Sequence, residues 1–165
     1  SMKGKVFNIT KNGYHYISGL EYAQKATDLE LYELAIKFKN ITNLDEGFLS
    51  DPYSNYSNYF QLFSERNCYI LYKNVPSQKH LVIEWYKKCL KAGSMLKIDA
   101  EGLRELLKNI GFKYILLSAN RFDIVKDSPY FDEIIKNNKY GIFKLKEDIR
   151  QAINIMKRSS QCQKQ

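Results

Sequence analysis

A chain of 165 residues, of which 44% are apolar and 14% aromatic, is long enough to bury one hydrophobic core, and this composition excludes a disordered chain. Its 26 Lys and Arg exceed its 18 Asp and Glu, so the formal net charge is +8 and anionic partners are favoured. Three cysteines without CxxC or Cys/His spacing indicate neither a zinc site nor a closed disulfide framework.

The N-terminal region is rich in Lys, Asn, Gly and Tyr. Residues 1–18 are predicted to be irregular, with one short strand at Val6–Ile9. A single α/β domain is expected over residues 19–158, followed by a polar tail at 159–165. Ser1–Met2 is typical of a cloning remnant, so we interpret the chain as a fragment of a longer protein.

The next region changes from helix to strand. Apolar residues recur at three- and four-residue intervals over Ser18–Asn40, and Asp28 is expected to cap a helix over Leu29–Lys39. Gly47–Ser50 predicts a short buried strand. Asp51–Pro52 ends that strand, because proline lacks the backbone donor.

The middle of the chain predicts one strand and two helices. The strand covers the apolar run Cys68–Lys73. The first helix is expected over residues 78–92, with Gly93 as its stop. The second covers Ala100–Asn109, with Asp99 as its cap.

The last region contains the most apolar run of the chain. After a helix stop at Gly111, Tyr114–Ser118 predicts a buried central strand. A turn or short helix is expected near Tyr130–Asn137, and a last strand over Tyr140–Leu145. Lys146–Arg158 has the spacing of an amphipathic helix.

This order of elements defines a fold class. Helices alternate with short strands, which is typical of the α/β class. We predict a small mixed sheet of about four short strands, covered by helices in two or three layers, within a single compact domain.

The sequence contains no clear catalytic motif. Asp45, Glu46 and Asp51 could form a carboxylate cluster, but roles in turns and at helix ends explain them more simply. We therefore expect no catalytic residue, no metal ion and no cofactor. Cys68 and Cys89 are expected to be small core residues, and a disulfide between them stays open.

Four residues are candidates for contact with a ligand or partner. Tyr53, Tyr56 and Tyr59 are interleaved with Ser and Asn in a predicted loop, where tyrosines can stack on sugars or bases. Packing against the domain itself is the alternative. Arg66 is expected to be buried and paired with a carboxylate, tying the predicted strand to the helix that carries Trp85, with anion binding as the competing use.

The order of several segments resembles a known family. The segments are Ile41–Leu49, Asp51–Pro52, Phe63–Arg66, Lys73–Pro76, Glu84–Tyr86, Tyr114–Ser118 and Tyr140–Leu145. This order is similar to that of the soluble C-terminal domain that follows the membrane helices in multispanning bacterial proteins. Those proteins are related to polyprenyl-phosphate-sugar glycosyltransferases of the GT-C-like class. The resemblance covers residues 28–146.

The resemblance implies a role without catalysis. In that family the catalytic acids lie between membrane helices, so this domain would be non-catalytic and lie on the extracytoplasmic face. Its partners would be the membrane-embedded part of the same protein and a glycan, and the charge of +8 would favour anionic lipid headgroups. The Trp-Trp-Asp motif of oligosaccharyltransferase domains is absent.

Two other functions stay open. The high pI and the tyrosines are also typical of a standalone cytoplasmic module that binds nucleic acid or another polyanion. A small enzyme that uses Asp45, Asp51 or Arg66 in a cleft is the third possibility.

Overall fold

The computed structural model describes residues 5–10, 13–18 and 28–146. The predicted helix after Lys146, the polar tail and the helical pattern before Asp28 lie outside these residues. Strand β1 (Lys5–Thr10) pairs with β2 (Gly13–Ser18) in an antiparallel hairpin, where the sequence predicts an irregular segment with a single strand. The second strand combines aromatic and β-branched residues, which favour extended backbone.

A mixed four-stranded sheet organises the rest of the described chain, as predicted. Its strand order is β3–β4–β6–β5. The short strand β3 (Phe48–Leu49) runs parallel to β4 (Tyr114–Ser118). Strand β6 (Tyr140–Leu145) is antiparallel to both β4 and the edge strand β5 (Phe131–Lys136).

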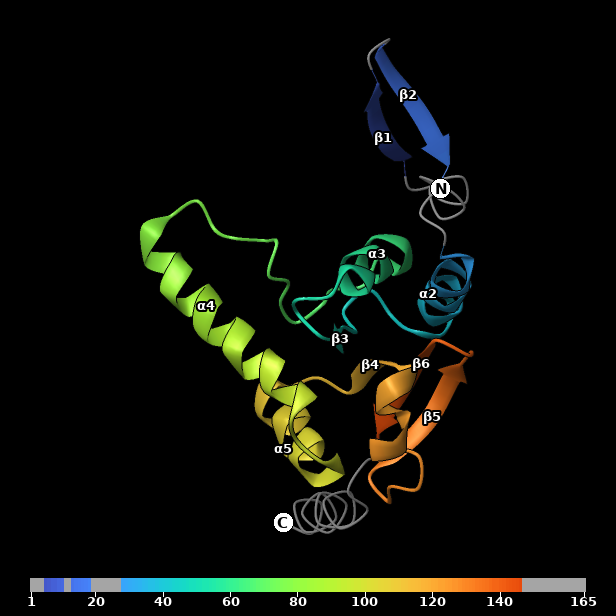
Figure 1. Ribbon diagram of the computed structural model, residues 1–165, viewed down its shortest axis with the longest axis vertical. Helices are drawn as coiled ribbons and strands as arrows, with labels where there is room; N and C mark the ends of the chain where they lie inside the picture. Colours follow the sequence, from blue (N-terminus) through green and yellow to red (C-terminus); the bar gives the residue numbers. More distant parts are fainter. Residues whose placement is uncertain (1–4, 11–12, 19–27, 147–165) are drawn as a thin grey trace, which may run out of the picture.

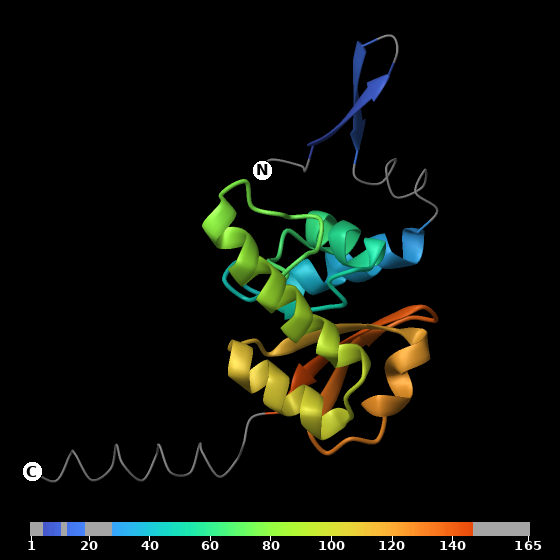
Figure 2. The ribbon, with the colours of Figure 1, turned by 60° about the vertical axis from the view of Figure 1, so that its left-hand side comes forward.

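Helices cover both faces of this sheet, so the domain has three layers. Helices α2 (Leu29–Ile41) and α3 (Asn55–Ser64) lie on one face, and α5 (Ala100–Ile110) and the short helix η2 (Ala119–Ile124) lie on the other (Figure 2). Helix α4 (Lys79–Gly93) runs along the side of these layers (Figure 1). It continues directly into the single turn η1, which covers residues 94–96.

The two faces of the sheet build two separate cores. Neighbouring side chains of a strand point to opposite faces. In β4, Tyr114 and Leu116 therefore pack with α2 and α3, whereas Ile115 and Leu117 pack with α5. Phe38 of α2 lies at the centre of the first core, with its ring 5.2 Å from that of Tyr114.

Local signals at helix ends are confirmed. The Asp28 side chain accepts a hydrogen bond from the backbone N–H of Leu31, as an N-cap does. Asp99 caps α5 in the same way through Gly102 N–H. Gly111 ends α5 with a φ of 73°, a conformation that favours glycine.

The predicted strand at Cys68–Lys73 is wrong. Only Cys68 forms an isolated bridge, with Phe48. Phe48 donates its backbone N–H to Asn67 and accepts one from Tyr69, both at 2.9 Å. The chain then turns away, and Tyr72 donates its N–H to the Pro52 carbonyl. The apolar run lacks a continuous partner strand, so no ladder extends along it.

The expected turn or short helix near Tyr130–Asn137 is also wrong, because strand β5 occupies this region. The side-chain oxygen of Asn137 accepts the backbone N–H groups of Lys139 and Tyr140, at 3.0 and 2.8 Å. This local arrangement reverses the chain into β6, so the segment before it pairs with β6 as a strand.

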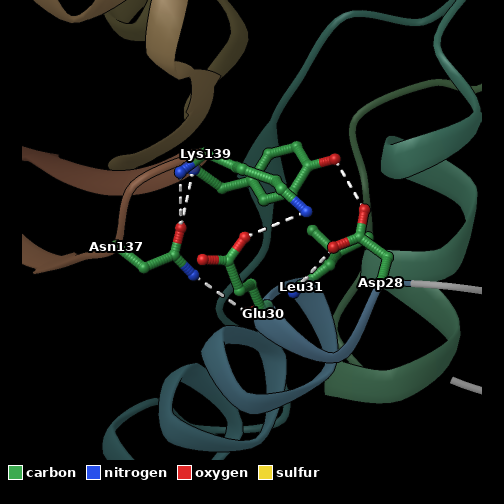
Figure 3. Close-up of polar contacts among 6 residues, drawn as sticks. Asp28, Glu30, Leu31, Asn137 and Lys139 are labelled. Atoms are coloured by element: carbon green, nitrogen blue, oxygen red, sulfur yellow. Dashed lines mark hydrogen bonds and ion pairs between the residues drawn. The ribbon is translucent and has the colours of Figure 1, made fainter. Parts of the chain in front are cut away.

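The β5–β6 turn is fastened to the start of α2 (Figure 3). Tyr140 donates its hydroxyl proton to Asp28 Oδ2 at 2.7 Å, while Oδ1 of the same carboxylate caps α2. Asn137 donates its side-chain N–H to the Glu30 carbonyl at 2.9 Å, and Lys139 Nζ lies 3.1 Å from Glu30 Oε2. These contacts hold the N-terminal end of α2 against the sheet.

The Tyr140 hydrogen bond makes a measurable contribution to stability. Replacing Tyr140 with Phe removes the donor and leaves the Asp28 carboxylate with one partner fewer, so we expect a loss of about 1.5 kcal/mol in the free energy of unfolding. The exposed Tyr86→Phe is the matched control and should change it by less than about 0.5 kcal/mol. Urea unfolding measures both. Equal effects of the two variants would contradict the assigned role.

The same pair predicts a pH dependence. Burial, and then the Asp28 carboxylate, raise the pKa of the Tyr140 hydroxyl above its usual range. The contribution of the neutral phenol is therefore fully present below the unfolded pKa of about 10, and it is lost as the pH rises through the folded pKa. The stability difference between wild type and Tyr140→Phe should stay constant up to about pH 9 and shrink above about pH 10.

Candidate functional site

The predicted tyrosine loop is a helix. Residues from Asn55 onward form α3, so the prediction of a loop is wrong. Ser54 is its N-cap, and the preceding Asp51 carboxylate accepts the Tyr53 N–H at 2.9 Å. Phe60 is buried on the inner side of the helix. This cap and the apolar spacing outweigh the Ser and Asn content. Tyr56 and Tyr59 therefore lie on α3, whereas Tyr53 precedes the helix.

Two of these tyrosines pack against the domain. The Tyr56 ring lies 5.3 Å from that of Tyr140, and burial raises the pKa of its hydroxyl. The Tyr59 ring stacks on Phe63 at 6.3 Å. Both are half-buried and pack against the core between α2, α3 and the sheet. Tyr56 therefore faces inward, whereas Tyr59 also borders a surface groove described below.

Tyr53 lies at the surface, beside α4. Its ring is 5.3 Å from that of Tyr72, which in turn is 5.3 Å from the ring of the buried Trp85. A Cβ atom added to Gly93 would lie 2.9 Å from Tyr53 Cε2, so the absence of a side chain at Gly93 admits this ring. Gly93 is the last residue of α4, as predicted, but its φ of −61° shows that it is no left-handed cap.

Trp85 is the predicted core anchor of α4. Its ring N–H donates to the Leu71 carbonyl at 3.2 Å, which attaches the helix to the segment after the isolated bridge. Lys73 donates to Asn55 Oδ1 at 2.7 Å and so links the same segment to the start of α3. Both residues hold elements together.

Arg66 is buried as predicted, but its predicted carboxylate partner is wrong. The guanidinium donates to the backbone carbonyls of Lys39 and Thr42 at 2.7 and 2.6 Å, and to Thr42 Oγ1 at 3.0 Å. It therefore occupies the C-terminal end of α2, where carbonyls lack helical partners and the helix dipole favours a cation. Anion binding by Arg66 would compete with these contacts.

The acidic residues near β3 serve the local backbone. Glu46 accepts the Asn43 N–H at 3.0 Å, and Asp51 accepts that of Tyr53. Asp45 borders a hollow of about 390 Å³ together with Glu46 and Lys113. In the described ranges, no group of three His, Cys, Asp or Glu side chains could hold a metal ion. The contacts of Glu46 and Asp51 therefore agree with the roles in turns and at helix ends that the sequence favours.

A shallow groove of about 480 Å³ lies between α3 and the turn that follows Leu71. The lining residues are Asn58, Tyr59, Gln61, Leu62, Leu71 and Asn74. Three neutral amide side chains and one aromatic ring thus meet at one surface. Sequence reasoning missed this groove, because it predicts a loop where α3 forms and a strand where the chain turns after Leu71. Only the polar side chains of α3 could have indicated it.

The four sequence-predicted contact residues do not form one site. Tyr53 lies beside α4, Tyr56 faces the core, Tyr59 borders the groove and Arg66 caps α2. No protein-family model matches the chain, and a search of the curated proteins found no match. Among the described helices, none is long and apolar enough to cross a membrane. The fold defines an α/β domain with a three-layer arrangement.

Removing the Arg66 side chain should be strongly destabilising. Arg66→Ala leaves buried carbonyls at the end of α2 without donors, so we expect a loss of about 3 kcal/mol in the free energy of unfolding. Arg66→Lys should recover less than half of it, since an ammonium cannot reproduce the planar fork. Lys37→Ala, which removes an exposed cation from the same helix α2, should cost less than about 0.5 kcal/mol. Urea unfolding that ranks Arg66→Ala with this control would contradict the capping role.

The two described thiols should be unreactive. Cys68 and Cys89 are free, and burial raises the pKa of the Cys68 thiol to about 12. At about pH 8 the folded protein should therefore resist iodoacetamide at both positions, because the thiolate is the nucleophile. Peptide mass mapping measures this, with the urea-unfolded chain as the control that reacts at both. Rapid modification of Cys68 in the folded chain would contradict its burial.

Proposed function

We propose that this chain is a non-catalytic, extracytoplasmic α/β domain of a membrane glycosyltransferase-like protein, and that it contacts a glycan. The observation that carries the proposal is the groove between α3 and the turn at residues 71–74. The order of segments over residues 28–146 supports the membrane-protein context through its resemblance to that family.

The groove has the chemistry that neutral sugars need. The side-chain amides of Asn58, Gln61 and Asn74 can both donate to and accept from sugar hydroxyls. The Tyr59 ring offers an apolar surface for the C–H face of a sugar ring. The Asn58 amide donates to the Ser54 carbonyl at 3.3 Å, and Gln61 accepts the Cys68 N–H, so both side chains are held in place by the fold.

A binding role also fits the hydrogen bonds that the acidic side chains make. Glu46, Asp51 and Asp99 each accept a backbone N–H, so their carboxylates are used in turns and caps. General acid–base catalysis needs a carboxyl group placed to exchange a proton with a substrate. The groove contains no ionisable acid among its lining residues. Its composition therefore favours recognition of a neutral ligand.

Titration of the ¹⁵N-labelled chain with chitotetraose and with mannotetraose tests the proposal. We expect backbone amide shifts confined to α3 and residues 71–74. Asn74→Ala should weaken binding at least about threefold, because one side chain–sugar hydrogen bond is lost. Asn109→Ala, an exposed amide on α5, is the matched control and should bind like wild type. Absence of shifts with both sugars, or shifts centred elsewhere, would overturn the assignment of this groove.

A further inference from the structure

Helix α4 has a second apolar face that no described element covers. Its inner face carries Trp85, Cys89 and Ala92, which are buried. Ile83, Tyr86 and Leu90 follow each other at intervals of three and four residues, so they share another side of the helix. Their exposed fractions are 62%, 51% and 52%.

Lysines surround this outer face. Helix α4 contains four lysines and one glutamate, which makes four positive charges against one negative charge. Lys79 lies four residues before Ile83, and Lys87 lies four residues after it, so both share its side of the helix. Lys79, Lys87, Lys88 and Lys91 are all exposed. The helix contains no arginine.

Within the described part of the chain, the position of α4 leaves this face accessible. The helix forms one edge of the domain, with the sheet and the other helices on its inner side (Figure 1). Tyr53 and Tyr72 are also exposed next to the helix, where Tyr72 packs on Trp85, and their rings carry a hydroxyl. Aromatic rings of this kind favour the boundary between headgroups and acyl chains.

We propose that the outer face of α4 docks on an anionic lipid bilayer. An apolar row with flanking lysines on a helix surface is the pattern of a helix that lies in the membrane interface. The apolar side chains enter the headgroup boundary, and the lysine stems reach outward so that the ammonium groups meet lipid phosphates. The inference goes beyond the glycan groove, because none of these α4 residues lines it.

Other occupants fit the face less well. Proteins that bind nucleic acid rely on arginine forks, whereas α4 has no arginine and exposes the aliphatic Ile83 and Leu90. In a symmetric dimer of two copies, the lysines of one α4 would lie near those of the other and repel them. An anionic bilayer satisfies both the charge and the apolar row.

Vesicle co-sedimentation of the 165-residue chain tests this inference. Wild type should bind vesicles of equal parts phosphatidylcholine and phosphatidylglycerol, and it should bind pure phosphatidylcholine much more weakly. Lys79→Glu with Lys87→Glu lowers the net charge from +8 to +4, since each substitution removes two charge units. This variant should bind anionic vesicles at least about tenfold more weakly.

A matched variant separates the α4 face from overall charge. Lys37→Glu with Lys126→Glu also gives a net charge of +4, and both positions are exposed outside α4. This control variant should bind anionic vesicles at least threefold more tightly than the α4 charge variant. Attraction that depends only on net charge would give both variants the same affinity. Ile83→Ser with Leu90→Ser should weaken binding while the net charge stays at +8. Circular dichroism and thermal melting check that every variant is folded.

Several outcomes would overturn the inference. Failure of anionic vesicles to retain the wild type would contradict it, and so would equal binding of the two charge-matched variants. A labelled oligonucleotide bound as tightly as the vesicles, with no effect of the Ile83 and Leu90 substitutions, would assign the face to nucleic acid. A concentration-dependent dimer in sedimentation velocity that these substitutions abolish would assign it to a second copy. The sugar titration of the α4 variants should match that of wild type whichever way the vesicle result falls.

Discussion

The buried guanidinium of Arg66 at the end of α2 is the interaction on which the arrangement of the first core depends. Three of its contacts go to the last turn of α2 and the residue after it. Thr42 itself donates its hydroxyl proton to the Phe38 carbonyl at 2.6 Å, and Lys39 Nζ lies 2.6 Å from Glu65 Oε1. The end of α3 is thus fastened to the end of α2. Helix α2 then packs Phe38 against β4, and its start is held by the β5–β6 turn.

The packing of α3 against α2 determines which side chains lie at the surface. Because α3 is held with Phe60 and Phe63 inward, Tyr56 turns toward the sheet and Tyr59 toward the groove. The chain after Arg66 crosses Phe48 and returns to Pro52, which brings Tyr72 beside Tyr53. The Trp85 contact then positions α4 against this pair of rings. The groove and the α4 face are consequences of the same packing.

Features with local causes could be predicted from the sequence. Asp28, Asp99 and Gly111 act on backbone groups within a few residues, and Tyr114–Ser118 is apolar because the sheet buries it on both faces. The class of the fold followed from the order of these elements. Each of these signals depends only on residues within one short segment.

Features that need a distant partner were missed. Cys68–Lys73 is apolar, but it meets the short β3 at a single bridge and then turns away. The strand at residues 131–136 is an exception, because it follows from a local turn: Asn137 accepts the N–H groups of Lys139 and Tyr140 and so reverses the chain into β6. The contact residues are neighbours in sequence but not in space: Tyr53 precedes α3 and lies beside α4, Tyr56 faces the core, and Tyr59 borders the groove. Arg66 is buried as predicted, but its guanidinium donates to backbone carbonyls at the end of α2 and not to a carboxylate.

We propose that this domain acts through contact surfaces, with the outer face of α4 turned to a bilayer. Hydrogen–deuterium exchange of the 165-residue chain, with and without phosphatidylglycerol-containing vesicles, tests this most directly because it locates the contact without substitutions. We expect slower exchange in α4 and unchanged exchange in α5. Unchanged exchange in α4, or protection centred on α5 or on the edge strand β5, would contradict it.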